Sequence, residues 1–177
     1  MMHIYKLKKY YFINEFNHTH LINLNKNISF IWRNKDKETS INTLVKLRDF
    51  CKKNQRNFYI SNDIRLAQKI DADGVYISSS NKNLNLRGVS FKKRFKILGS
   101  AHGLKEIKIK ELQNTEEIFL SPLFKKKTNP PLNIYRYLKL RGITKMKDIS
   151  LGGINNKNLK KLNMIKPFGF AGISYFE

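Results

Sequence analysis

Short apolar runs alternate with more polar, helix-like segments along most of the chain. Several of these runs are nearly continuous, as expected for strands that are buried on both faces of a parallel sheet. Strands are predicted at residues 9–13, 28–33, 57–61, 74–78, 95–100, 117–122, 148–153 and 168–174. Strands that alternate with helical segments predict an α/β protein built from parallel βα units.

The segments between these strands favour helices. Residues 38–54 place apolar side chains at helical spacing, and Thr39 or Ser40 is suited to cap the start of that helix. Asp63 is placed to begin a helix over 63–70. Further helices are expected at 104–113, at 131–142 with Gly142 as its stop, and at 156–165.

Eight βα units close naturally into a (β/α)8 barrel, the TIM-barrel fold. The chain has 177 residues, which is short for a fold that usually takes about 250. Residues 14–27 leave little room for a first helix, and only Tyr175-Phe176-Glu177 follow the last strand. We therefore predict one TIM-barrel domain over 1–177, trimmed, with a short first helix and no eighth helix. A doubly wound open sheet is the alternative.

The net charge of +22 changes the expected partners more than the fold. A basic surface attracts phosphorylated small molecules as well as nucleic acid. The lysines and arginines are scattered along the whole chain, whereas nucleic-acid binders usually concentrate them on one face or arm. We expect phosphorylated small-molecule substrates and no specific nucleic acid, with nucleic-acid binding kept as an alternative. The oligomeric state stays open.

Three further features bear on where the protein works. The sequence has no run of about 18 apolar residues, so no membrane-spanning helix is expected. Its N-terminus lacks the long apolar segment and cleavage site of a secretory signal. The single cysteine, Cys51, cannot form an internal disulfide, which fits a reducing compartment. We expect a cytoplasmic protein.

Polar residues follow the predicted strands, and in a barrel all of these strand ends meet at one mouth. Arg33 and Lys35 are two apart in an extended segment, so both cations could face the same diphosphate. Asn62 could donate to a phosphate or take a turn conformation. Asp63 could ligate Mg²⁺ or simply cap its helix. For Arg33 and Lys35 the plain alternative is a solvated strand end.

Two glycines follow the seventh predicted strand. Gly152-Gly153 would let backbone N–H groups approach an anion, and a tight turn is the plain alternative. The backbone at Ile173 and Ser174 would complete a phosphate site between the last two strand ends. His102 could act as a general acid or base, or serve only the structure.

Together these strand ends resemble the thiamine phosphate synthase and TenI-like family. The resemblance runs from Ile28 to Ser174. It rests on IWRNK (31–35), NDIRLAQKIDADGVYIS (62–78), SAH (100–102), SPLFKKKTNP (121–130), LGGINNKN (151–158) and GFAGIS (169–174), six motifs in order. Membership implies a (β/α)8 barrel and a transferase that joins hydroxymethylpyrimidine diphosphate to thiazole phosphate and releases diphosphate.

The resemblance also implies roles. Arg33, Lys35 and Asn62 would hold the diphosphate, Asp63 would ligate Mg²⁺, and Ser100 would contact the pyrimidine. The residues expected at the thiazole-phosphate end are Thr128, Asn129, Gly152, Gly153, Ile173 and Ser174.

The sequence departs from the family pattern at several of its positions. Ile31 replaces a Gln, and Asn81 replaces a second metal-binding carboxylate, which would weaken the hold on Mg²⁺. Lys126 replaces a Thr, and Asn129 replaces a diphosphate-binding Lys. A lysine within 125–127 could supply the missing cation.

The resemblance leaves two alternatives to a synthase. One is a thiazole tautomerase, although Pro122 stands where that activity uses a His. The other is a barrel that binds a thiamine-related phosphate without catalysis.

Overall fold

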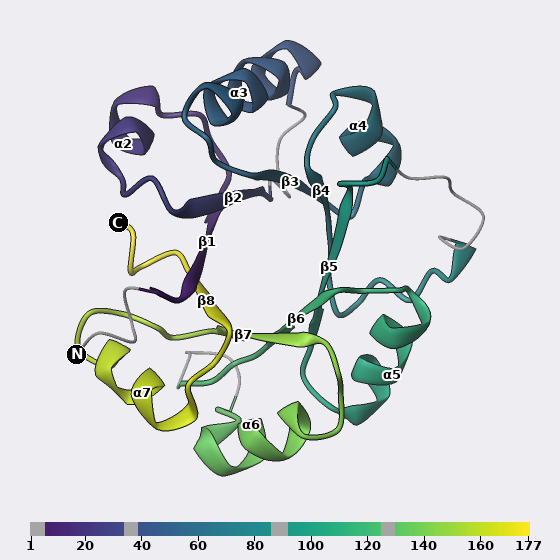
Figure 1. The fold of residues 1–177 in the computed structure, drawn as a ribbon, viewed down its shortest axis with the longest axis vertical. Coiled ribbons are helices and arrows are strands. Elements are labelled where there is room, and N and C mark those ends of the chain that lie inside the picture. The colour runs from purple at the N-terminus through teal and green to yellow at the C-terminus, as the bar shows by residue number, and fades with distance from the viewer. Residues whose placement is uncertain (1–5, 34–38, 86–91, 125–129) are drawn as a thin grey trace.

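Eight parallel strands close into a barrel in which each strand pairs with its neighbours in sequence (Figure 1). The computed structural model describes residues 6–33, 39–85, 92–124 and 130–177. The strands are β1 Lys8–Ile13, β2 Ile28–Trp32, β3 Phe58–Ser61, β4 Gly74–Ile77, β5 Lys96–Ala101, β6 Glu117–Leu120, β7 Lys147–Leu151 and β8 Gly169–Gly172. The prediction of a TIM barrel is confirmed, and the open sheet is excluded because β1 pairs with β8.

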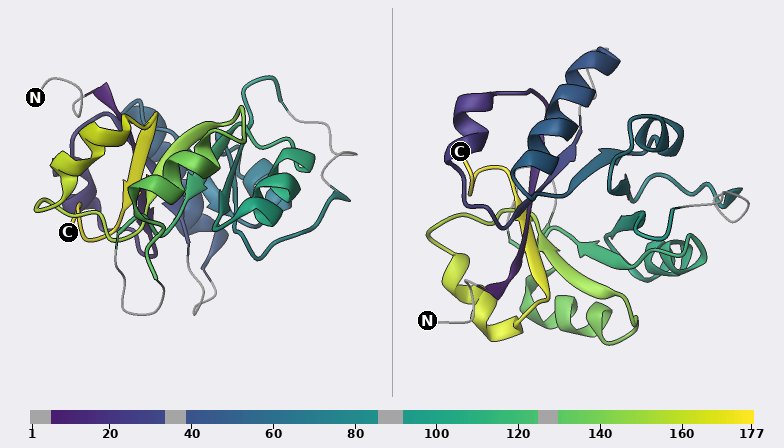
Figure 2. Two further views of the ribbon diagram at one scale, coloured as in Figure 1. Left: turned by 90° about the horizontal axis from the view of Figure 1, so that it is seen from below. Right: turned by 45° about the horizontal axis from the view of Figure 1, so that its top comes forward.

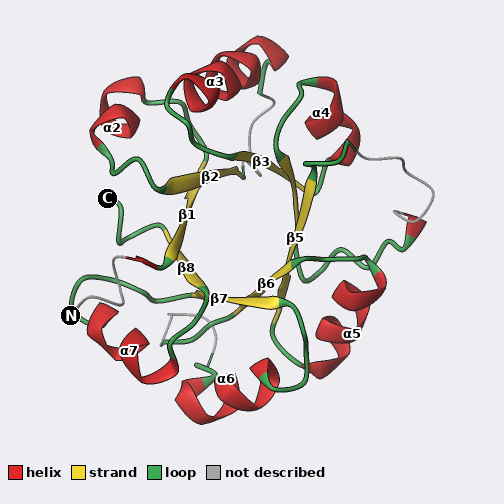
Figure 3. Ribbon diagram, in the orientation of Figure 1, coloured by secondary structure: helices red, strands yellow, loops and turns green. Residues whose placement is uncertain are grey.

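The helices lie outside the ring of strands (Figures 2 and 3). They are α2 His18–Asn23, α3 Ile41–Lys53, α4 Ile64–Lys69, α5 Leu104–Leu112, α6 Asn133–Arg141 and α7 Leu162–Ile165. The first of these has six residues, as the short connection predicted, and no helix follows β8 in the described part of the chain. None of the described helices has the length and hydrophobicity that crossing a bilayer requires.

One segment is less helical than predicted. Residues 156–165 form a short 3-10 helix, η2 (Leu159–Lys161), followed by the single turn of α7. The Asn155 side chain accepts from the backbone of Lys157 and Asn158 at 3.0 and 3.2 Å, and such local bonds compete with a helix. Between β4 and β5, where no helix was predicted, the asparagine side chains of Asn81 and Asn83 accept from the backbone two residues on.

One core fills the inside of the barrel. Its edge-on aromatic contacts include Phe12–Tyr76, with 5.1 Å between ring centroids, and Tyr76–Phe119, with 5.2 Å. The other buried members are Tyr10, Ile31, Tyr59, Leu98, Ile149 and Ala171. The centre is therefore packed, and ligands are left with the ends of the barrel.

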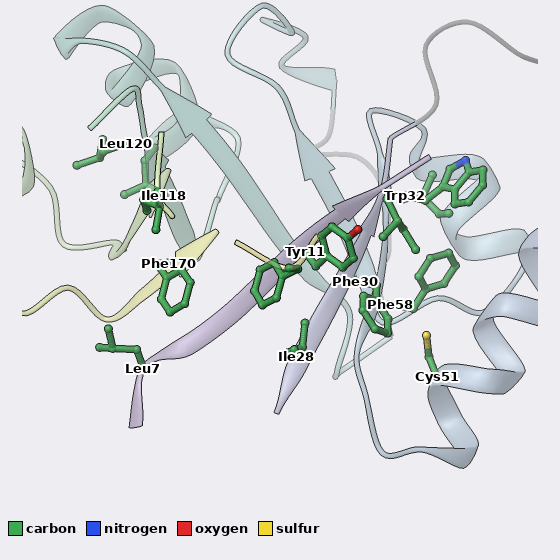
Figure 4. Packing of buried hydrophobic residues seen from close by; sticks show 14 of the residues in the cluster. Leu7, Tyr11, Ile28, Phe30, Trp32, Cys51, Phe58, Ile118, Leu120 and Phe170 are labelled. Carbon is green, nitrogen blue, oxygen red and sulfur yellow. The ribbon is translucent and has the colours of Figure 1, made fainter. Parts of the chain in front are cut away.

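A second core lies between the strands and the helices (Figure 4). Phe30 and Phe58 from neighbouring strands belong to it, together with Cys51 on α3. Burial raises the pKa of the Cys51 thiol to about 12, so this cysteine is an apolar packing residue rather than a nucleophile.

The amino end of the barrel is closed by a buried carboxylate. Glu117 accepts from Lys8 Nζ at 2.6 Å and from the Tyr10 hydroxyl. Burial lowers the pKa of Lys8, and the hydrogen bond and negative charge of Glu117 oppose that shift. Burial also raises the pKa of Tyr10, so its hydroxyl remains a donor to the carboxylate.

Candidate active site at the carboxyl end of the barrel

Asp63 caps the helix that follows β3. Its Oδ1 atom accepts a hydrogen bond from the backbone N–H of Leu66 at 2.9 Å. The capping role foreseen as the plain alternative is therefore present. Asn17 and Ser40 cap α2 and α3 in the same way. A polar capping side chain therefore follows each of the strands β1, β2 and β3.

Arg33, Asn62 and Asp63 line one pocket of about 430 Å³ at the carboxyl ends of β2, β3 and β4. We call it the β2–β4 pocket. The hydroxyls of Ser61, Ser78 and Ser80 lie on its lining, together with the apolar residues Trp32, Leu44, Ile60 and Leu66. A cation, an amide, a carboxylate and hydroxyls thus surround a space large enough for a phosphorylated group.

The Asn62 side chain has a defined orientation in this pocket. The residue has a left-handed backbone, with φ at 62°, which asparagine tolerates better than most residues. Its Oδ1 atom accepts from Ser78 N at 2.9 Å and lies 3.4 Å from Asn81 Nδ2. These donors identify Oδ1 as the atom that faces the segment after β4. The amino group, Nδ2, lies 3.5 Å from the hydroxyl of Ser61, another residue of the pocket lining.

Arg33 extends past the end of β2. Its backbone N–H donates to the Ile13 carbonyl at 2.8 Å, and its guanidinium lies 5.8 Å from the centroid of the Phe12 ring. The same residue lines a second pocket of about 380 Å³ with Glu15, His20 and Ile173. Arg33 therefore lines both pockets. Ile173, which was predicted to lie at the thiazole-phosphate end of the site, lines the second pocket.

Ser100 lies beneath the mouth and is buried. Burial raises the pKa of the neighbouring Tyr76, and the Ser100 side chain and the charge of Arg33 oppose that shift. Ser100 lines neither the β2–β4 pocket nor the pocket with Ile173. A pyrimidine could contact Ser100 only by entering the mouth of the barrel, outside these two pockets.

Gly152 and Gly153 form a tight turn that packs on the segment after β6. Their φ angles are +97° and +71°. A Cβ at Gly152 would lie 2.8 Å from Pro122, and the Gly153 carbonyl accepts from Asn158 Nδ2 at 2.7 Å. The plain alternative of a turn therefore accounts for both glycines. Neither they nor Ser174 line either pocket beside Arg33.

His102 ties the ends of β5 and β6 together. Its Nδ1 atom lies 2.7 Å from the Ser121 carbonyl oxygen and donates to it. Its backbone N–H donates to the Glu106 carboxylate. These contacts support the structural role over acid–base chemistry.

Several predicted residues lie outside the described ranges. These are Lys35, Thr128, Asn129 and the lysines of 125–127. Among the described residues, no three His, Cys, Asp or Glu side chains gather as a metal site would require. Asp63 is the carboxylate among the described residues that line the β2–β4 pocket, and Asn81 has an amide where a second carboxylate was expected.

Two residues near the site escaped the sequence analysis. Lys110 and Gln113 on and just after α5 are buried and hydrogen-bond to the segment after β4. A signal was present, since Lys110 is three residues after Ile107, which places both on one helix face.

A closed parallel barrel with a cation and polar donors at its carboxyl mouth defines a (β/α)8 protein of the kind that binds ligands at that end. Residues 23–176 match the model of the family described as thiamine monophosphate synthase. The chain belongs to this family.

Individual relatives agree with that match. The chain is 30% identical to a thiamine-phosphate synthase of Staphylococcus haemolyticus over 138 residues, which are 73% of this chain and 63% of that protein. It is 29% identical to one of Pelagibacter ubique over 170 residues, covering 92% of this chain and 81% of that protein. The match therefore spans less than two thirds of the first relative's length.

A solved structure shares the fold. It is a thiamine phosphate pyrophosphorylase from Pyrococcus furiosus, with a TM-score of 0.70 and 16% identity, covering 98% of this chain and 88% of that one.

Proposed function

We propose that this chain is a thiamine phosphate synthase, which joins hydroxymethylpyrimidine diphosphate to thiazole phosphate and releases diphosphate. Family membership supports the reaction. The observation that carries it is the β2–β4 pocket, which brings Arg33, Asn62 and Asp63 together.

The reaction needs a site for a departing anion. The bond between the pyrimidine methylene carbon and the diphosphate oxygen breaks, its electron pair leaves with diphosphate, and the thiazole nitrogen forms the new bond to carbon. The Arg33 guanidinium provides a fixed positive charge, and the Asn62 amino group provides hydrogen-bond donors. Donors that are already in place stabilise the charge that grows on the leaving group.

The donor set of the pocket fits a Mg²⁺ ion that is shared with the substrate. Mg²⁺ is commonly held by one or two carboxylates together with substrate phosphates and water. Asp63 Oδ1 caps α4, and we assign Oδ2 to the ion. When bound, the ion would neutralise charge on the diphosphate. With Asn81 as a neutral neighbour, we expect weak binding without diphosphate.

One competing function is supported by a specific observation. Asn81 lies against Asn62 in place of a second carboxylate, so a barrel that binds diphosphate without turnover would show the same pocket. A thiazole tautomerase is less well supported, because Pro122 offers no imidazole.

The test is a turnover assay with matched variants. Purified protein is incubated with both phosphorylated substrates and Mg²⁺, and thiamine phosphate is detected by mass spectrometry. We expect product with the wild type and with Arg136→Met, an exposed arginine on α6, and little product with Arg33→Met. Diphosphate binding without product would support the non-catalytic barrel, and neither binding nor product would contradict both functions.

A further inference from the structure

A lysine and a glutamine are buried beneath the segment that follows β4. Lys110 and Gln113 have 0% and 1% of their surface exposed. Lys110 Nζ donates to the Asn81 carbonyl and to Gln113 Oε1, both at 2.8 Å. Gln113 Nε2 donates to the carbonyl of Asn83 at 2.7 Å and to that of Asn81 at 3.2 Å. Two buried side chains thus hold two backbone carbonyls of one short segment.

The barrel makes room for this arrangement. A Cβ at Gly99 of β5 would lie 2.8 Å from Lys110 Cδ, so the absence of a side chain there lets the lysine stem pass. Burial lowers the pKa of Lys110 to about 8, with the Glu106 charge opposing the shift, so the ammonium is still mostly charged at neutral pH. A buried ammonium is costly unless its donors are bonded. An apolar residue at this position would meet the needs of packing, so packing alone does not explain the lysine.

The held segment leads directly to the β2–β4 pocket. Asn81 N donates to the Ser78 carbonyl at 3.1 Å, so residues 78–81 form a turn. Ser78 N and Asn81 Nδ2 both face Asn62 Oδ1. A continuous series of hydrogen bonds therefore connects Lys110 to the amide of Asn62, through Asn81 and the turn.

We infer that Lys110 and Gln113 are positioning residues for the anion site: they fix the turn at 78–81, which orients the Asn62 amide with its amino group available to diphosphate. Neither residue lines the β2–β4 pocket itself. The identity of the anion rests on the proposed function, whereas the orientation of Asn62 does not.

A double-mutant cycle tests this inference. Diphosphate binding in the presence of Mg²⁺ is measured by calorimetry for the wild type, Lys110→Met, Asn62→Ala and the double variant. Met keeps the length of the lysine stem and removes the donors. We expect each single change to weaken binding about tenfold, because Asn62→Ala removes the amino group that donates to the anion and Lys110→Met removes the bonds that hold this amino group in place. The double variant should bind like Asn62→Ala alone.

The matched control is Lys108→Met on the same helix. Lys108 is exposed and pairs with Glu111, three residues further on, at 3.1 Å. This variant should bind diphosphate like the wild type. If Lys110→Met does not fold, Gln113→Met takes its place in the cycle, since Gln113 also donates to the Asn81 carbonyl.

Amide hydrogen exchange provides a second measurement that needs no ligand. Protection of the Ser78 and Asn81 amides should fall in Lys110→Met and stay unchanged in Lys108→Met. Additive losses in the cycle, unchanged protection, or a wild type that binds no diphosphate would each overturn the inference. A coupled cycle in a protein that forms no thiamine phosphate would instead refute only the proposed turnover.

Discussion

The side-chain oxygen of Asn62 lies 2.9 Å from the backbone nitrogen of Ser78, and this hydrogen bond joins the carboxyl ends of β3 and β4. Its direction matters for function. An amide that spends its oxygen on the protein offers its amino group to a ligand, and an amino group suits an anion. The electrostatic character of the pocket at this point is therefore set by the segment after β4 as much as by Asn62.

Replacing Asn62 by Asp should be worse for diphosphate binding than replacing it by Ala. Asp keeps an acceptor for Ser78 but turns a negative oxygen toward the anion, where like charges repel. We expect Asn62→Asp to bind diphosphate at least about tenfold more weakly than Asn62→Ala, a difference of about 1.4 kcal/mol. Calorimetry at fixed Mg²⁺ measures both. Equal or tighter binding by the Asp variant would mean that the amide points the other way.

Glu117→Gln should destabilise the fold without touching the carboxyl mouth. The change leaves Lys8 without its charged partner in a largely buried site, and breaking such a pair costs about 3 kcal/mol. The neighbouring Glu116 is exposed, so Glu116→Gln is the matched control and should change stability little. Urea denaturation compares the two. A loss of similar size in both variants would show that the buried pair has no special weight.

Substitution by alanine should have different effects at Gly152 and at Gly103. Gly152→Ala places a Cβ at 2.8 Å from Pro122 on a backbone with φ at +97°, so it should destabilise the protein by about 1–3 kcal/mol. At Gly103, which has no positive φ, a Cβ would meet nothing within 4 Å, and Gly103→Ala should be tolerated. Thermal melts of both variants check this. A harmless Gly152→Ala would show that the turn at the end of β7 can relax.

Asp71 should make stability sensitive to acid. Hydrogen bonds from Lys52 and Lys92 lower the pKa of its carboxyl to about 2. A carboxylate whose pKa is lower in the folded state stabilises above the unfolded pKa, and this contribution is lost as the pH falls toward about 2. Because the side chain is exposed, Asp71→Asn should cost less than about 1 kcal/mol at neutral pH.

The acid dependence of that loss is the diagnostic. The difference in unfolding free energy between wild type and Asp71→Asn should shrink between pH 4 and pH 2, and also in high salt. Urea titrations at several pH values measure it. A difference that stays constant over this range would contradict the ion-pair explanation.

The sequence was sufficient for the barrel because its signals are local. Strands buried on both faces give continuous apolar runs, and caps such as Ser40 and Asp63 mark where helices begin. The helix predicted at 156–165 was wrong in extent, because apolar spacing does not reveal that Asn155 and Asn158 bond to the nearby backbone. The positions of Arg33, Asn62 and Asp63 directly after predicted strands also indicated that they lie near one another, and in the structure they line one pocket.

The positions of Lys110 and Gln113 depend on tertiary structure. A lysine on a short helix is normally solvated. The burial of Lys110 depends on the missing side chain at Gly99 and on the Asn81 carbonyl, and Gln113 in turn depends on the carbonyls of Asn81 and Asn83. These partners are 11 or more residues away in sequence. The roles of Gly152 and Gly153 illustrate the reverse case, since a motif that suggested anion binding also serves close packing on Pro122.

A crystal structure of the protein with diphosphate and Mg²⁺ tests the central claim most directly. Our account predicts diphosphate density in the β2–β4 pocket, with oxygens within hydrogen-bond distance of the Arg33 guanidinium and Asn62 Nδ2 and with the ion beside Asp63. Diphosphate bound outside the β2–β4 pocket, or an Asn62 side chain whose Oδ1 atom faces the diphosphate, would contradict the account.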